Sequence, residues 1–283
     1  MALQIITDST SYIPANLIKK YNIEILSLNI LMNGESKRET DWENEKFYIE
    51  MKKSGEFPKS AQPYIEEIKN MFEENIKQGN HILGIFMSSK MSGTYSTATM
   101  IKQHLIEIYP EARIELIDSR SNSMQLGFAA IEGAKAASMG KSIEEAMKEV
   151  NHVINHSRFI FTPENLEYLK KGGRIGGAAA LMGHLLKIRP ILTVENGETT
   201  VLTKARTKKR AVEILIGKFY EDISLNELGA VIVHHINCEE EGKAIAKMIE
   251  EKLGIEVDVQ PIGPVIGTHV GPGSVAVAYW WKS

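Results

Sequence analysis

Hydroxyl-bearing and acidic residues gather at three points of the sequence, each directly after a short apolar run. These points are Thr7–Ser9, Ser88–Tyr95 and Asp118–Ser119. The apolar runs predict buried strands of a parallel sheet, whose carboxyl ends meet at one edge. Hydroxyls and free N–H groups at the start of a following helix bind carboxylates or phosphates. The sequence therefore predicts an oxyanion site at this edge, although Ser92 also suits an ordinary role as a helix N-cap.

Two further side chains are suited to hold an oxyanion. His269 lies within Gly267–Gly273, where three glycines and a proline allow a tight loop and a close approach of the backbone to a ligand. Arg174 lies in a glycine-flanked loop, and a guanidinium there would grip an oxyanion from the second half of the chain. A loop histidine with ordinary partners and a solvated arginine explain these residues equally well, so both alternatives stay open.

The sequence lacks the motifs of nucleotide-binding and metal-binding sites. Gly140–Ser142 resembles the end of a phosphate-binding loop, but Lys135 stands where that motif begins with glycine. Ser142 instead pairs with Glu145 in the pattern of a helix capping box. His234 and His235 would point to opposite faces of a strand, and no HExxH-like cluster follows metal-ligand spacing. We therefore expect no metal, no cofactor and no ATP site in this chain.

The elements that must position these residues follow an α/β pattern. In the first half, short apolar runs alternate with longer amphipathic segments, which is typical of a doubly wound parallel sheet. A second series begins at Arg158 and includes Asn196-Gly197, which suits the type I′ turn of a hairpin. We predict two domains that pack directly on each other, residues 1–157 and 158–283, the second with a mixed sheet. The polar segment Asp41–Tyr64 predicts a loop or an insertion that reaches across the cleft between them.

Composition narrows the class of protein. The chain has 283 residues, 43% hydrophobic and 24% charged, which is ordinary for a globular protein and long enough for two domains. A net charge of −3 provides no global field for nucleic acid or an anionic membrane. The single cysteine, Cys238, excludes an internal disulfide framework. Because we also find no secretion signal and no apolar run near about 20 residues, we expect a cytoplasmic protein without stable membrane insertion.

Five segments, in this order and at these spacings, resemble the DegV family over essentially the whole chain. They are Thr7–Ser9, Ser60–Pro63, Ser88–Tyr95, Lys171–Ile175 and Gly267–Gly273. The resemblance implies a two-domain α/β protein that buries one long-chain fatty acid, such as palmitate, stearate or oleate, between its domains. It would be the fatty-acid-binding (FakB-type) subunit of bacterial fatty acid kinase, without an ATP site or turnover of its own. A separate subunit of dihydroxyacetone-kinase type would phosphorylate the bound carboxylate, and the acyl-phosphate would feed phospholipid synthesis.

The resemblance also implies roles for individual residues. The carboxylate would be held by Ser60, Ser92, the backbone N–H of Gly93 and His269, while Arg174 would serve the phosphotransfer and partner-facing side. The family segment usually reads Thr-Ser-Gln-Pro-Ser, whereas this chain has Ser-Ala-Gln-Pro-Tyr at residues 60–64. A serine at the first position keeps the hydroxyl, so binding should survive.

A buried acyl chain of about 16 carbons needs an apolar tunnel, since each buried CH₂ is worth about 0.8 kcal/mol. The apolar helix that we predict over Ala178–Leu186, together with Ile262 and Val265, would be able to line one, although ordinary core packing explains the same residues. The head group, once taken out of water, needs several hydrogen-bond donors.

Two other functions remain possible at this point. A serine hydrolase or acyltransferase acting on lipid esters would use Ser92 as nucleophile, His269 as base and Asp8 or Asp118 to orient the base, but the sequence has no GxSxG elbow. A sensor whose lipid occupancy is itself the signal ranks last, because no DNA-binding element is recognisable.

Overall fold

The structure is a computed structural model that describes residues 2–282, without the side chains of residues 183–187. The first 155 residues contain β1 (Leu3–Asp8), η1 (Ser9–Ser11), α1 (Ala15–Tyr21), β2 (Glu24–Leu26), β3 (Asn29–Met32), β4 (Glu35–Arg38), η2 (Glu39–Asp41), α2 (Asn44–Ser54), β5 (Lys59–Ala61), α3 (Ile65–Lys77), β6 (His81–Phe86), α4 (Thr94–Ile108), β7 (Ile114–Asp118), α5 (Ser123–Ser138) and α6 (Ile143–Asn155). The remainder contains β8 (Ser157–Thr162), α7 (Glu167–Lys171), η3 (Gly176–Lys187), β9 (Arg189–Glu195), β10 (Glu198–Ala205), α8 (Lys208–Ile223), β11 (Glu227–His235), α9 (Glu239–Leu253), β12 (Asp258–Pro261), α10 (Pro264–Val270) and β13 (Val275–Lys282).

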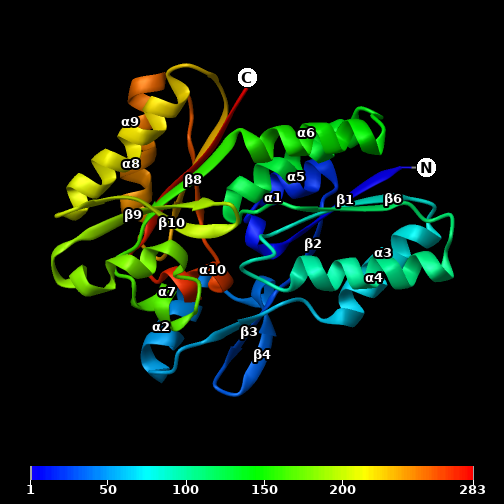
Figure 1. Cartoon of the computed structure of the whole chain (residues 1–283), viewed down its shortest axis with the longest axis horizontal. Helices are drawn as coiled ribbons and strands as arrows, with labels where there is room; N and C mark the ends of the chain where they lie inside the picture. Colours follow the sequence, from blue (N-terminus) through cyan, green and yellow to red (C-terminus); the bar gives the residue numbers. More distant parts are fainter. Residues whose placement is uncertain (1, 283) are drawn as a thin grey trace.

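The first half builds a parallel sheet of four strands in the order β2-β1-β6-β7. Its central strands β1 and β6 are buried almost throughout, because helices cover both faces. Helices α5 and α6 pack on one face, and α3 and α4 pack on the other (Figure 1). The predicted parallel α/β architecture of this half is confirmed, and the carboxyl ends of its strands face the second half.

The second half builds a mixed sheet of six strands in the order β10-β9-β8-β13-β11-β12. Only β11 and β12 pair in parallel, while the other neighbours are antiparallel. Helices α8 and α9 cover one face of this sheet (Figure 1). The predicted hairpin at Asn196-Gly197 is confirmed, since β9 and β10 pair across it and both residues have the positive φ of a type I′ turn, +50° and +84°.

Helix α5 joins the two halves. It packs on β1 of the first sheet and on β8 and β13 of the second. Twelve of its 16 residues are buried, as expected of a mostly apolar helix that packs between two sheets. One hydrophobic cluster extends from Ile5 in β1 to Ala278 in β13. The two halves therefore pack directly on each other, as predicted, while the boundary at residues 157 and 158 stays a prediction.

Of the two alternatives for Asp41–Tyr64, the loop is wrong, because the segment has secondary structure of its own. The segment contains α2 and β5, and β5 adds to β3 and β4 to form a small antiparallel sheet. Helix α2 is held by Phe47, Tyr48 and Met51, which are buried although most of the helix is polar. The segment does lie near the second half, because α2, β3 and β5 all contact α10.

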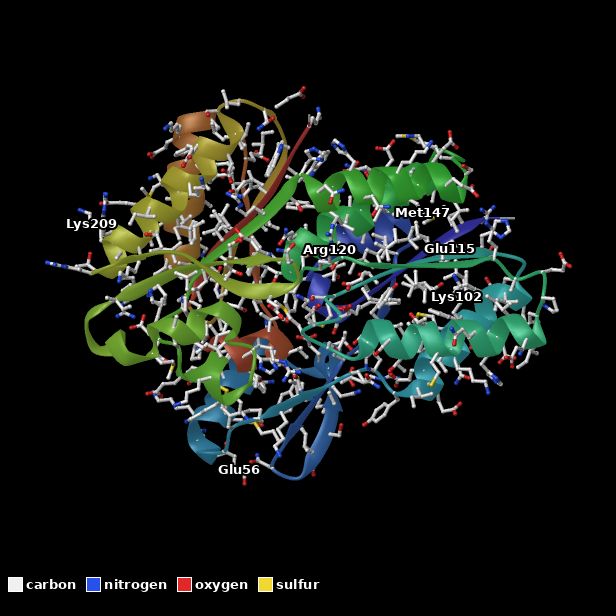
Figure 2. All side chains as sticks on the ribbon, in the orientation of Figure 1. Glu56, Lys102, Glu115, Arg120, Met147 and Lys209 are labelled. Atoms are coloured by element: carbon white, nitrogen blue, oxygen red, sulfur yellow. The ribbon has the colours of Figure 1, made fainter. Side chains whose placement is uncertain are left out.

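Charged side chains lie mainly on the outside of the molecule. Glu56 and Lys209 project outward from its rim, and Lys102 pairs with Glu115 at 3.1 Å on the surface (Figure 2). Within residues 2–282, no helix is long and apolar enough to cross a membrane.

Candidate functional site

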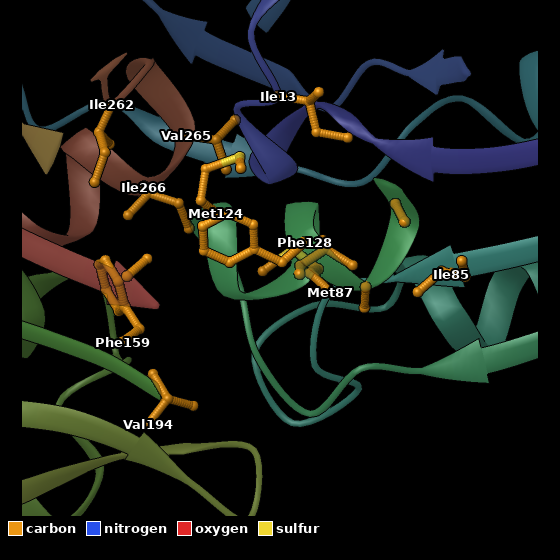
Figure 3. Close-up of a cluster of buried hydrophobic side chains, with 14 of the residues drawn as sticks. Ile13, Ile85, Met87, Met124, Phe128, Phe159, Val194, Ile262, Val265 and Ile266 are labelled. Atoms are coloured by element: carbon orange, nitrogen blue, oxygen red, sulfur yellow. The ribbon is translucent and has the colours of Figure 1, made fainter. Parts of the chain in front are cut away.

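A cavity of about 110 Å³ lies between the two halves of the chain. Small-molecule sites usually enclose roughly 300–1,000 Å³, so the cavity is narrow for a large ligand in this structure. Much of its wall is apolar and comes from both halves, including Leu28, Met87, Phe159, Phe161, Val194 and Ile266. Figure 3 shows several of these side chains converging from elements far apart in the sequence. Such a wall suits an elongated apolar ligand.

The five residues for which the resemblance implied a role all line this one cavity. They are Ser60, Ser92, Gly93, Arg174 and His269. Three come from the first half and two from the second. The polar cluster is therefore assembled only when the two halves pack together. The structure thus places the predicted residues together.

His269 lies near the end of α10, a short helix whose seven residues are all buried. Its Nε2 is joined to Ser60 Oγ by a hydrogen bond of 2.7 Å, and its Nδ1 has no partner among the described residues. Burial, reinforced by the charge of Arg174, lowers the pKa of the imidazole to about 4. His269 is therefore neutral at pH 7 and offers one donor and one acceptor nitrogen.

Glycine at position 172 is explained by this imidazole. A Cβ at Gly172 would overlap His269 Nδ1, so the ring packs directly on the backbone after α7. Gly173, the next residue, has a φ of +69°, which turns the chain toward Arg174. The paired glycines of Lys171–Ile175 thus serve the packing of the site.

Ser60 is carried by β5, whose pairing with β3 sets Ser60 opposite Ile30. The side chain is half-buried and points at His269 across the boundary between the halves. A strand positions the hydroxyl more firmly than the predicted loop would, because backbone bonds to β3 fix its register.

Ser92 and Gly93 directly precede the first turn of α4. Ser92 Oγ lies 2.9 Å from Thr94 Oγ1 and accepts a 3.3 Å hydrogen bond from the Thr94 N–H. Gly93 is the N-cap residue of α4, and a Cβ there would overlap Gln62 Oε1. A 15-residue helix therefore presents its N-terminal end to the cavity, where its unpaired N–H groups favour an anion.

Arg174 bridges the two halves. Its Nε and Nη2 donate to the carbonyl oxygen of Met91 at 3.0 and 2.9 Å, and its Nη1 donates to Gly172 at 2.8 Å. The residue is exposed as well as lining the cavity. The guanidinium is thus placed at the mouth, between the buried histidine and solvent.

Sequence reasoning assigned no role to three further polar residues that line the cavity, Gln62, Asn122 and Thr199. Gln62 lies in the segment that carries Ser60, and Asn122 closely follows Asp118–Ser119, so both were near recognised signals. Thr199 lies on β10 and gives no signal of its own, because only the fold of the hairpin brings it to the cavity.

The expected tunnel lining is only partly found. Val265 lines the cavity, and Ile262 is buried in the same cluster (Figure 3). The segment Ala178–Leu186 forms part of the 3₁₀ helix η3 rather than an α-helix. Of its residues, the side chains of 183–186 lie outside the described part of the chain.

The residues named for a serine hydrolase are not assembled into a triad. His269 bonds to Ser60 rather than Ser92. Asp8 accepts hydrogen bonds from the N–H groups of Thr10 and Met87 at 3.0 and 2.7 Å, and burial raises its pKa to about 6. Asp118 accepts from Ser89 and Arg120 backbone groups. No carboxylate orients the imidazole among the described residues, so the geometry disfavours that alternative.

The same part of the chain contains no group of three or more histidine, cysteine or acidic residues arranged to hold a metal ion. Taken together, fold and cavity define a class of protein: an α/β binding protein of two sheets, whose apolar site between the halves ends in a few hydrogen-bonding groups.

The chain belongs to the DegV family. The family model described as "Uncharacterised protein, DegV family" matches residues 2–282. A DegV domain-containing protein of Clostridium acetobutylicum is 51% identical over 280 residues, which covers 99% of this chain and 98% of that protein.

Solved structures of the family have the same fold over the whole chain. A DegV from Bacillus subtilis, described as a fatty acid binding protein, has a TM-score of 0.90 at 31% identity and covers 100% of both chains. A stearic acid-binding protein from Eubacterium ventriosum has a TM-score of 0.91 at 26% identity, with 99% of this chain and 98% of that chain covered.

Proposed function

We propose that this chain binds one long-chain fatty acid in the cavity between its two halves. The observation that carries the proposal is the cavity itself, which combines apolar walls with the cluster of Ser60, Ser92 and His269. The relatives described as fatty-acid and stearic acid-binding proteins support it, because they have this fold at full coverage. The acyl chain would lie along the apolar walls, and the carboxylate would lie at the cluster.

In this proposal the carboxylate is held by hydrogen bonds rather than by a buried ion pair. The donors would be the Ser60 and Ser92 hydroxyls and the Gly93 N–H. The neutral imidazole of His269 would donate through Nε2 to Ser60 Oγ, which leaves the Ser60 hydroxyl proton for the carboxylate. A hydrogen bond to a charged group is worth about 1.5–3 kcal/mol, so several of them offset the desolvation of the head group. Because His269 stays neutral when buried, the head group meets no permanent charge deep in the site that would retain a product.

We further propose that the bound fatty acid is a substrate for a separate kinase subunit of dihydroxyacetone-kinase type. A carboxylate oxygen would attack the γ-phosphorus of ATP on that subunit, giving acyl-phosphate and ADP, and the acyl-phosphate would serve phospholipid synthesis. Arg174 would lie on the partner-facing side, since it is exposed at the mouth of the cavity. A guanidinium there would stabilise charge on the transferred phosphoryl group.

Native mass spectrometry of the purified protein, followed by denaturing extraction, tests the binding step. We expect a stoichiometric ligand with the mass of a C16–C18 fatty acid. Ser92→Ala and His269→Ala should each lose occupancy, whereas Ser138→Ala, whose hydroxyl lies at the end of α5 outside the cavity, should keep it. An empty protein that also fails to take up added oleate or palmitate would overturn the proposal.

The kinase step has its own test. In a mixture with a dihydroxyacetone-kinase-like subunit and ATP, we expect Arg174→Ala to bind oleate but to form acyl-phosphate at least about tenfold more slowly, as for loss of one charge-stabilising donor. Equal rates for this variant and the wild type would remove Arg174 from the phosphotransfer side.

A further inference from the structure

Helix α10 is held at its start by residues of the opposite half of the chain. Glu39, in η2, accepts hydrogen bonds through Oε1 from the Val265 N–H at 2.8 Å and from the Tyr12 hydroxyl at 2.8 Å. The Tyr12 hydroxyl in turn accepts from the Ile266 N–H at 3.2 Å. The first turn of α10 thus bonds to Glu39 and Tyr12, more than 220 residues earlier in the sequence.

Glu39 is itself tightly fixed. Its side chain is 4% exposed, and Oε2 accepts a hydrogen bond from the Ser9 hydroxyl. Ser9 Oγ also accepts from the Leu28 N–H at 3.1 Å, so its hydroxyl is anchored to the backbone of the first half. A buried carboxyl without partners would cost several kcal/mol, and here each oxygen has at least one donor.

Glu39 packs closely against the start of α10. A Cβ at Gly263, the N-cap residue of α10, would come within 2.8 Å of Glu39 Oε1. On the other side, the Tyr48 hydroxyl of α2 donates toward the carbonyl oxygens of Ile262 and Gly263 at 3.3 Å. A shift of the carboxyl would therefore move the start of the helix.

The same helix carries a wall and a head-group residue of the cavity. Val265, Ile266 and His269 all line it. Val265 and His269 are four residues apart, which places them one helical turn from each other. The bond from Glu39 thus acts one turn away from the imidazole that meets Ser60.

We propose that Glu39 is a positioning residue of the binding site, which fixes the start of α10 and thereby places His269 against Ser60. This inference rests on the proposed fatty-acid function. Glu39 does not line the cavity, so it acts through α10 and not by contact with the ligand. A merely structural carboxyl would lower the free energy of unfolding without a specific effect on His269.

A double-mutant cycle separates the two roles. The dissociation constant for oleate is measured for the wild type, Glu39→Ala, His269→Ala and the double variant. We expect Glu39→Ala alone to weaken binding about tenfold or more, because the Val265 N–H at the start of α10 loses its buried acceptor. In the His269→Ala background the same change should cost less than about twofold, because the residue it positions is gone. Equal losses in both backgrounds would overturn the inference.

Two conservative variants and one control complete the experiment. Glu39→Gln retains an oxygen at Oε1 and should bind oleate within about threefold of the wild type. Glu24→Ala is the control, because this half-buried carboxyl accepts from Asn75 at 3.0 Å and lies outside the cavity, so binding should not change. Should Glu39→Ala fail to fold, Tyr12→Phe removes the hydroxyl that bonds both Glu39 and Ile266 and should weaken binding in the same non-additive way.

A ligand-free measurement distinguishes failure of this inference from failure of the proposed function. The ¹⁵N chemical shifts of the His269 ring report its bond to Ser60, and we expect Glu39→Ala to change them and Glu24→Ala not to. If the wild type binds no oleate but the His269 shifts respond, the fatty-acid function falls and the positioning role stands. If oleate binds and the shifts do not respond to Glu39→Ala, the positioning role falls.

Discussion

At the residue scale, the proposed head-group site depends on the hydroxyl of Ser60, which threonine would keep and alanine would remove. Ser60 Oγ lies 2.7 Å from His269 Nε2, at the position where the family resemblance implies threonine. We expect Ser60→Thr to keep the affinity for oleate, since the hydroxyl remains and a β-branched residue suits strand β5. Ser60→Ala should weaken binding about tenfold, because a buried carboxylate loses a donor.

Isothermal titration of oleate into the three proteins measures this difference. Thermal unfolding serves as the control, and both variants should stay near the wild type because Ser60 is only half-buried. Equal affinities for all three proteins would remove the Ser60 hydroxyl from the head-group site.

At the element scale, the turn after α7 is fitted to the imidazole of α10. Because a Cβ at Gly172 would overlap His269 Nδ1, we expect Gly172→Ala to displace the ring and to weaken oleate binding about tenfold or more. Its backbone has a φ of −76°, so alanine adds no conformational strain of its own.

The matched control is Gly217→Ala in α8, where an added Cβ meets no atom within 4 Å. Alanine in a helix interior should raise the free energy of unfolding by about 0.5–1 kcal/mol and leave binding unchanged. Binding by Gly172→Ala at wild-type affinity would contradict the close packing of this turn on His269.

Local patterns predicted the elements whose signals lie in adjacent residues. The turn at Asn196-Gly197 and the capping box of Ser142 and Glu145 are both confirmed. Helix α2 was missed because its few buried side chains pack on a distant element, and its own sequence is mostly polar. Segment η3 was expected as an α-helix because apolar content alone does not distinguish a 3₁₀ turn from an α-helix.

In the candidate site, too, residues within recognisable motifs were predicted and residues placed only by the tertiary fold were not. Ser60, Ser92, Gly93, Arg174 and His269 were expected together from the family resemblance, and the structure places them around one cavity. Glu39 gave no signal, because its partner Val265 lies 226 positions away and only the tertiary fold brings the two together. Thr199 was missed for the same reason.

At the scale of the whole molecule, both carboxyls and imidazoles are buried, and two of them, Glu39 and His269, bond across the junction of the halves. Burial raises the pKa of Asp8 to about 6 and of Glu39 to about 7. Burial also lowers the pKa of His234 and of His269 to about 4. The native state thus holds two carboxyl protons that the unfolded chain has lost near pH 5 to 6, and lacks two imidazole protons that the unfolded chain binds there.

These two effects oppose each other. The carboxyls make the free energy of unfolding fall as the pH rises from their ordinary pKa toward the raised one. The histidines make it rise with pH between about 4 and their ordinary pKa of 6.5. Over the shared range the two contributions oppose each other, so we expect these four groups together to add only a weak pH dependence to the free energy of unfolding between about pH 4.5 and 6.

Removing the titration of one carboxyl should therefore make the pH dependence from the histidines visible. Glu39→Gln cannot titrate, so its free energy of unfolding should gain on the wild type as the pH rises from 5 to 7, by at most about 1.4 kcal/mol per pH unit. Urea unfolding at pH 5, 6, 7 and 8 measures the difference, with Glu56→Gln, an exposed residue, as the control that should run parallel to the wild type. Parallel curves for Glu39→Gln and the wild type would mean that Glu39 keeps an ordinary pKa in the folded protein. A growing gap would show that the carboxyl bonded to α10 also couples the junction of the two halves to pH.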